Sequence, residues 1–379
     1  MNSSKGNTTR ATIVVSLVLA LASLGDTLIY PVLSSDYQAF GVPFFWVGIL
    51  LSVNRLVRLV ANRLVAYAIQ VMGLRRSSIW AATIAAVSTM MYALNHQLIG
   101  LLVARIGWGV AYATLRINTI HVALEGEKKG WQLGLSGAFY EVGPLLALGI
   151  GPMLIKAVGI QITFIALGVL SFVGVYLAFG LPQSEGEAQD AQIARLDLPR
   201  VIEQLVFVVA LVIEGALVVV MATLFLQVGV KPNQLIALTA FYLIIRRLSG
   251  LLFAPLVGWL ADTFGLKKVF MITLIGVVIA LLMISVGGTE SVFLKWGLIA
   301  SFISARMFAN LSPAMAIQMH PTIERLHLLA SLTTWRDLGA ALGALLGLVV
   351  LQMLGTSVLF GIATFVILIY TLWILKNEH

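Results

Sequence analysis

Apolar residues occupy this sequence in long runs, and short polar segments separate the runs. Twelve of them reach the length of about 20 mostly apolar residues that a helix needs to cross a bilayer. The pattern therefore predicts an all-α membrane protein with twelve transmembrane helices. The runs cover roughly 11–34, 44–69, 77–95, 97–117, 131–154, 159–181, 203–228, 235–261, 268–288, 292–316, 328–353 and 355–375.

Composition narrows the protein class further. Of 379 residues, 60% are hydrophobic and 11% are charged, whereas a soluble domain has about 45–50% apolar and about 25% charged residues. These values argue against a soluble enzyme, a disordered protein or a partner for nucleic acid. The net charge is +8, and with so little polar surface we expect the cations to be distributed relative to a bilayer. Cysteine is absent, which excludes disulfides and thiolate metal sites.

Lys and Arg are concentrated in the loops on one side of the predicted bundle. That side holds thirteen of them, and the other side holds only Lys156, Lys231 and Lys295. Because basic loops favour the cytoplasm, we expect both termini there, in a multi-pass protein of a cell membrane such as the bacterial inner membrane. The first run is too long for the core of a signal peptide, and we interpret it as retained.

The one long polar stretch lies near the middle of the chain. It predicts an N-terminal six-helix bundle over 1–181, a cytoplasmic linker over 182–202 and a C-terminal six-helix bundle over 203–379. The two halves also share markers in the same order, which indicates a duplication. The pairs are Gly25-Asp26 and Glu214-Gly215, Gly73-Leu74-Arg75-Arg76 and Gly265-Leu266-Lys267-Lys268, Arg105 and Arg306, and Tyr140-Glu141 and Arg336-Asp337.

The segment from Gly258 to Lys268, with Leu-Ala-Asp262 and Gly265 inside it, resembles the loop signature of the major facilitator superfamily. The resemblance covers the whole chain and implies two bundles that expose a central site alternately to the two sides. It also implies a cytoplasmic gate that uses Gly258, Asp262, Gly265 and Lys267. The first-half copy keeps Gly73, Arg75 and Arg76 but has Gln70 in place of the aspartate and Ala66 in place of the first glycine.

Two further segments resemble the proton-coupled exporters of drugs, metabolites and siderophores in this superfamily. Arg105 with Gly109 is similar to a motif whose arginine is linked to proton coupling. Gly143-Pro144, with Gly149 and Gly151 nearby, partly resembles an antiporter motif, although Ala147 and Leu148 occupy its paired-glycine positions. Close helix packing through small residues is the other interpretation of these glycines.

Charged residues inside the apolar runs are the candidates for function. A charge at the centre of an inserting helix costs about 2.5–3.5 kcal/mol, so such residues face protein or a water-filled cavity. If every acid pairs with one arginine, four arginines remain, and a guanidinium suits carboxylate or phosphate. We therefore expect an anionic substrate, although Arg63 and Arg116 also fit contacts with lipid phosphates or a gate. The arginines are Arg55, Arg58, Arg63, Arg105, Arg246, Arg247, Arg306 and Arg336, and the acids are Asp26, Glu141, Glu214 and Asp337.

Helical spacing places many polar residues on shared faces. We assign substrate binding to Asp26, Tyr30, Arg55, Arg58, Arg105, Tyr112, Arg247, Arg306, Asn310, Trp335 and Arg336. Proton coupling falls to Asp26, Glu141, Glu214 and Asp337, with fixed ion pairing as the alternative, and the repeat favours at least one of Glu141 and Asp337. No P-loop is present, so direct use of ATP is not expected. The scattered histidines indicate no metal site, and we expect no cofactor.

These observations predict a monomeric secondary transporter rather than an enzyme. The leading hypothesis is proton-coupled export of a small anionic metabolite, rich in carboxylates and of the siderophore or metal-chelator type. Multidrug efflux and uptake of an organic anion are the alternatives within transport. A non-transporting membrane receptor or assembly factor is the alternative outside it.

Overall fold

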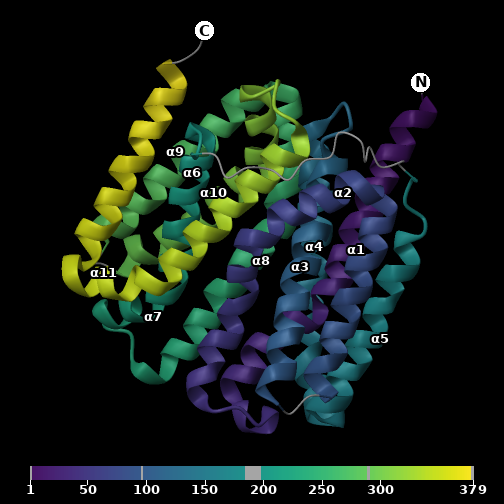
Figure 1. Ribbon diagram of the computed structural model, residues 1–379. Coiled ribbons are helices and arrows are strands. Elements are labelled where there is room, and N and C mark those ends of the chain that lie inside the picture. Colours follow the sequence, from purple (N-terminus) through teal and green to yellow (C-terminus); the bar gives the residue numbers. More distant parts are fainter. Residues whose placement is uncertain (1, 95–96, 184–197, 288–290, 377–379) are drawn as a thin grey trace. The chain divides into compact units, whose positions relative to one another are not determined.

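The computed structural model describes residues 2–94, 97–183, 198–287 and 291–376 (Figure 1). The described part of the chain is helical and contains no strand. Most of the predicted linker, 184–197, lies outside the described residues, so the predicted bundle boundaries stay a prediction. The elements are α1 (Asn2–Ser35), η1 (Tyr37–Phe40), α2 (Phe44–Leu94), α3 (Leu98–Ala123), α4 (Lys129–Val158), α5 (Ile160–Ala178), α6 (Val201–Val209), η2 (Ala210–Ala216), α7 (Leu217–Gln227), α8 (Pro232–Phe264), α9 (Leu266–Val286), α10 (Ser291–Met319) and α11 (Arg325–Lys376).

Among the described residues, ten helical stretches are long and apolar enough to cross a membrane. Two of them, in α2 and α11, are 49 and 52 residues long, about twice the length that a bilayer requires. Gly73 breaks α2 at φ 74°, and Gly355 breaks α11 at φ 76°, in the left-handed region that glycine adopts without strain. Each of these helices therefore makes two crossings, which accounts for the twelve predicted from the apolar runs.

The chain forms two compact units. Unit 1 comprises Met1–Leu196 and Ile323–Thr334, and unit 2 comprises Asp197–Thr322 and Trp335–His379. The first turns of α11 belong to unit 1 because Leu326 and Ala330 pack with Ala61 and Val65 of α2. In unit 1, α1 packs against α4 and α5, and α2 packs against α3 and α5. In unit 2, α10 packs against both α8 and α9.

Glycines allow the closest helix contacts in both units. A Cβ at Gly143 of α4 would overlap the Ala20 carbonyl of α1, and one at Gly151 would overlap the Leu28 side chain, whereas Gly149 faces open space. The packing interpretation therefore holds for Gly143 and Gly151. In unit 2, a Cβ at Gly343 of α11 would overlap the Leu211 carbonyl of η2. Small residues at such positions let backbones approach closely.

We expect Gly343→Ala to lower the melting temperature of the purified protein in detergent. The added methyl group has no room, and overpacking of this kind costs about 1–3 kcal/mol. The matched variant Gly149→Ala adds the same group where no atom lies within 4 Å, so its melting temperature should not fall. A Gly343→Ala protein as stable as the parent would show that the two helices are free to separate.

Candidate functional site

Two charged residues of unit 1 form an ion pair between α1 and α3. Arg105 of α3 pairs through Nη1 with Asp26 of α1; the arginine side chain is 1% exposed and the aspartate 15%. Arg105 is held by the backbone as well, because Nε donates to the Leu50 carbonyl at 2.8 Å and Nη2 to the Leu51 carbonyl at 3.4 Å. The guanidinium therefore does not depend on the carboxylate alone.

Three polar side chains surround this pair. Arg105 donates through Nη2 to the Tyr30 hydroxyl at 3.3 Å and through Nη1 to the Tyr92 hydroxyl at 3.4 Å. Asn54 donates through Nδ2 to Asp26 Oδ1 at 3.5 Å, and its Oδ1 is buried with no hydrogen-bond partner among the described residues. The sequence assigned Asp26, Tyr30 and Arg105 to substrate binding, and the structure brings these three side chains together. The sequence missed Asn54 and Tyr92, because one amide and one phenol in apolar helices carry no signal of their own.

A second group in unit 1 joins α2, α3 and α4 through aromatic rings. The Arg58 guanidinium lies 4.6 Å from the centroid of the Tyr112 ring, a distance at which cation–π attraction acts. Tyr112 packs against Trp108 at 5.8 Å and against Tyr140 at 6.4 Å between ring centroids. The structure thus brings together Arg58 and Tyr112 as the sequence predicted. Arg55, half-buried one turn away, has no hydrogen bond or ion pair to any residue that the structure describes.

The charged residues of unit 2 gather around Glu214. Arg336 of α11 donates to Glu214 through Nε at 3.1 Å and through Nη2 at 2.8 Å, the bidentate geometry that makes such pairs strong. Arg246 of α8 and Arg306 of α10 also interact electrostatically with Glu214. One carboxylate therefore stands among three guanidinium groups. The sequence assigned Arg247 rather than Arg246 to the site; both side chains are half-buried on α8.

Glu214 lies in η2, a π-helical segment between α6 and α7. Segments of this kind widen the helix by one residue per turn and are frequent at functional sites. Gly215, the next residue, packs against the backbone of α11 at Ala340 and Gly343. The close approach of η2 and α11 holds Glu214 and Arg336 side by side.

The structure also gives the burial or the contacts of other residues that the sequence assigns to substrate or protons. Glu141 of α4 and Asp337 of α11 are 1% and 8% exposed, which is consistent with acids that face protein rather than lipid. Asn310 donates to the Ala254 carbonyl at 3.4 Å. Trp335 packs on Phe207 with ring centroids 6.1 Å apart, and its indole N–H is buried without a hydrogen-bond acceptor in the described part of the chain.

Two of the predicted gate residues are glycines at breaks between helical segments, and Gly258 and Asp262 lie toward the end of α8. Gly73 is the break in α2, and Gly265 separates α8 from α9 at φ 98°. Gly258 is buried, Asp262 is exposed and Lys267 is half-buried. The guanidinium of Arg75 lies 5.8 Å from the ring centroid of Phe179.

Gln70, which replaces the signature aspartate in the first half, has its own partner in unit 1. Its Nε2 donates to Glu324 Oε2 at 2.8 Å. Glu324 in turn accepts from the backbone N–H groups of Leu326 and His327, each at 3.1 Å, and so caps the first turn of α11. The residue at the position of the signature aspartate is thus hydrogen-bonded to a carboxylate at the start of α11.

Within the described ranges, no group of three or more His, Asp or Glu side chains could hold a metal ion. Just beyond α10, burial and the nearby Arg200 guanidinium lower the pKa of His320.

Comparison with known proteins identifies the family. The family model of the Major Facilitator Superfamily matches residues 15–207 and again residues 204–379. The two matches together span almost the whole chain. No curated protein sequence matches it.

Solved structures share the fold at low sequence identity. The human organic anion transporter MFSD10 (TETRAN) is 16% identical, with a TM-score of 0.74 over 96% of this chain and 99% of its own. The proton:xylose symporter XylE is 12% identical, with a TM-score of 0.77 over 100% of this chain and 97% of its own. A bacterial homologue of the iron transporter ferroportin is 13% identical, with a TM-score of 0.68 over 97% and 98%. With its full-length family match and its membrane-spanning helices, the chain belongs to the Major Facilitator Superfamily and is a multi-pass transporter, not an enzyme.

Proposed function

We propose that this transporter exports a small, carboxylate-rich anion in exchange for protons. The observation that carries the proposal is in unit 2, where Glu214 pairs with Arg336 and also interacts electrostatically with Arg246 and Arg306. These four side chains carry three positive charges and one negative charge. In a membrane protein, an excess of this kind favours an anionic ligand, because isolated buried charges are costly.

The residue type supports a carboxylate rather than a cationic drug. The guanidinium of Arg presents a planar fork of donors that matches carboxylate and phosphate. A cation would meet repulsion from this group, which argues against multidrug efflux. The buried indole N–H of Trp335, which follows Thr334 and precedes Arg336, adds a neutral donor for a ligand oxygen. A polycarboxylate, including a metal chelator, offers enough acceptors for several arginines.

The similar solved structures do not identify the substrate of this transporter. Their names describe an organic anion transporter, a xylose symporter and a homologue of an iron transporter. The arginine excess agrees with the first of these cargo classes. The exporter direction rests on the likeness of Gly143-Pro144 to the antiporter motif, and uptake of an organic anion is the alternative for the same site.

Asp26 is the best candidate for the proton site. Arg105 cannot release its proton in a protein, so any change of charge in the pair falls on the carboxylate. If Asp26 takes up a proton, Arg105 keeps the two carbonyls of α2 and the two phenols as acceptors. The free Oδ1 of Asn54 could then accept the carboxyl proton. The pair can therefore change charge without leaving the guanidinium unsolvated.

We expect Arg306→Ala to weaken binding of a tricarboxylate such as citrate, or of a carboxylate chelator, by about 10- to 100-fold. The loss of one charge-assisted hydrogen bond costs about 1.5–3 kcal/mol, and 1.4 kcal/mol corresponds to a factor of ten. Titration calorimetry on the purified protein measures the Kd.

Arg63→Ala is the matched control, because it also removes a half-buried arginine, in this case from α2, but should leave the Kd unchanged. Equal affinity in the parent and in Arg306→Ala would refute the anion site. Binding of cationic dyes with no binding of polycarboxylates would instead favour multidrug efflux.

We expect Asp26→Asn to abolish transport driven by a pH gradient in proteoliposomes while substrate exchange continues without a gradient. The amide keeps the shape of the carboxylate but cannot titrate. Proton flux, followed with a pH-sensitive dye during substrate addition, should fall to the background of empty vesicles.

Glu141→Gln and Asp337→Asn provide the comparison, since the sequence assigns proton coupling to these buried acids as well. Intact proton flux in Asp26→Asn, together with loss of flux in one of these two variants, would move the proton site to that acid. Intact flux in all three would exclude proton coupling through them.

A further inference from the structure

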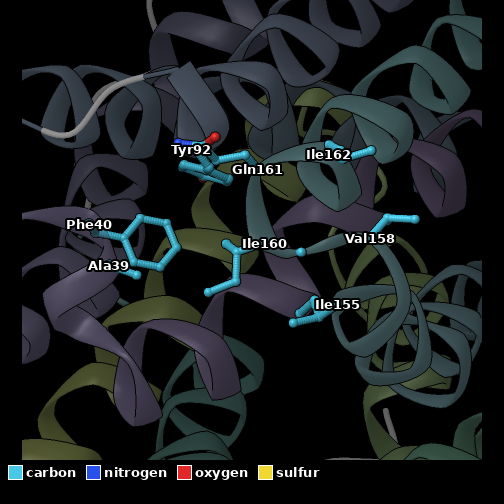
Figure 2. A pocket seen from close by; sticks show the side chains of 9 residues that line it. Ala39, Phe40, Tyr92, Ile155, Val158, Ile160, Gln161 and Ile162 are labelled. Carbon is cyan, nitrogen blue, oxygen red and sulfur yellow. The ribbon is translucent and has the colours of Figure 1, made fainter.

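A cavity of about 460 Å³ lies in unit 1. Three connections meet there: η1, the end of α2 and the turn between α4 and α5 (Figure 2). Its wall is apolar apart from Gln161 and Tyr92, and includes Phe40, Ile155 and Ile160. Small-molecule sites have this size and this composition of mostly apolar residues with few polar groups.

The position of the cavity relative to the membrane follows from the path of the chain. Gly73 turns α2 at the end that carries Arg75 and Arg76, and Tyr92 lies one crossing later, at the opposite end. The distribution of basic residues makes that opposite end extracytoplasmic. The cavity therefore lies in the outer half of the bilayer.

The rim of the cavity continues into the surface that faces lipid. Val158 and Ile162 both line it, and their side chains are 45% and 57% exposed within spanning helices. In a bilayer, the neighbours of such side chains are acyl chains. Water is a poor occupant, because a buried water needs two to four polar partners and the lining offers few.

A cation stands beside the apolar wall. Lys156 is exposed in the last turn of α4, next to the lining residue Ile155 and two residues before Val158. It is one of only three Lys or Arg residues that the sequence assigns to the extracytoplasmic loops. A lysine ammonium at a membrane interface attracts anionic headgroups.

We propose that this cavity binds an acyl chain of an anionic phospholipid from the outer leaflet, with the lipid phosphate at Lys156. The apolar wall takes the chain, and the rim of Val158 and Ile162 opens toward the bilayer. The assignment does not depend on the proposed substrate or on proton coupling.

The cavity also touches the ion pair of unit 1 through one residue. The Tyr92 ring lies in its wall and packs on Phe164 with ring centroids 5.8 Å apart, while the Tyr92 hydroxyl accepts from Arg105. A bound acyl chain would restrict the Tyr92 ring and thereby stabilise the position of Arg105. Lipid composition then acts on the Asp26–Arg105 pair from outside it.

The test uses the absence of cysteine in this chain, which allows a single introduced thiol to be modified after folding. Ala39→Cys places the thiol in the wall of the cavity, and Ala157→Cys places it on the exposed face of α4 outside the wall. Each protein is reconstituted in phosphatidylcholine nanodiscs with or without phosphatidylglycerol. Melting temperatures are compared before and after reaction with N-ethylmaleimide.

We expect phosphatidylglycerol to raise the melting temperature of both unreacted proteins by several degrees. Reaction with N-ethylmaleimide should remove that rise in Ala39→Cys and leave it in Ala157→Cys. Lys156→Gln should lose the rise, whereas Lys295→Gln, which removes another lysine of the same side, should keep it.

Three results would overturn the assignment. The first is an unchanged rise in reacted Ala39→Cys, and the second is an unchanged rise in Lys156→Gln. The third is an equal rise with glycerol 3-phosphate alone, which would make the ligand a soluble anion rather than a lipid. Because the readout is stability and not transport, failure here leaves the proposed function untouched, and the reverse also holds.

Discussion

The free energy of placing guanidinium groups in a bilayer is the constraint on which this structure depends. The two units compensate this cost with different sets of hydrogen-bond partners. Arg105 distributes its hydrogen bonds over one carboxylate, two backbone carbonyls and two phenols, so that no single partner is indispensable. Arg336 donates to both oxygens of Glu214, and Arg246 and Arg306 interact electrostatically with the same carboxylate. The first site therefore offers its arginine several acceptors, whereas at the second site one carboxylate interacts with three arginines.

Close backbone contacts place these groups. The helices that carry the charged residues are also those that touch through glycine: α1 with α4 at Gly143, and η2 with α11 at Gly343. Gly215 follows Glu214 directly, and Gly339 lies three residues after Arg336, so the ion pair of unit 2 is built into the tightest helix contact of that unit. An extra methyl group there would separate the partners as well as the helices. Gly143, which belongs to the segment that resembles an exporter motif, thus has a packing role. This role is compatible with function, because close helix packing fixes the positions of the charged residues.

Much of the fold could be predicted because a bilayer imposes simple rules on sequence. The lengths of the apolar runs predicted the membrane-spanning helices. The glycines of the repeated Gly-Leu-basic segments predicted where one helix ends and the next begins, as Gly73 and Gly265 show. The site was predicted only in part. The costly residues, such as Asp26 and Arg105, stood out against an apolar background, but Asn54 and Tyr92 cost little and did not. Arg246 and Arg247 are neighbours on α8, and consecutive residues of a helix point about 100° apart. A small error in the expected orientation of α8 therefore selects the wrong arginine. The π-helical segment at Glu214 changes the angle between consecutive residues in α6–α7, and composition gives no sign of such a segment.

The difference between the two groups bears on how proton and substrate would be coupled under the proposed function. The first apolar run of each predicted half contains an acid, Asp26 in one and Glu214 in the other. The acids have diverged in their surroundings: Asp26 pairs with one arginine that has other acceptors, and Glu214 stands among three. A proton is thus best accommodated in unit 1, and an anion in unit 2. After a duplication, arginines could be lost around Asp26 or gained around Glu214. Either change would place the proton and the anion on different halves of one chain. The proton and the anion then do not have to compete for one side chain. They are coupled if each shifts the same equilibrium between the conformations of the transporter.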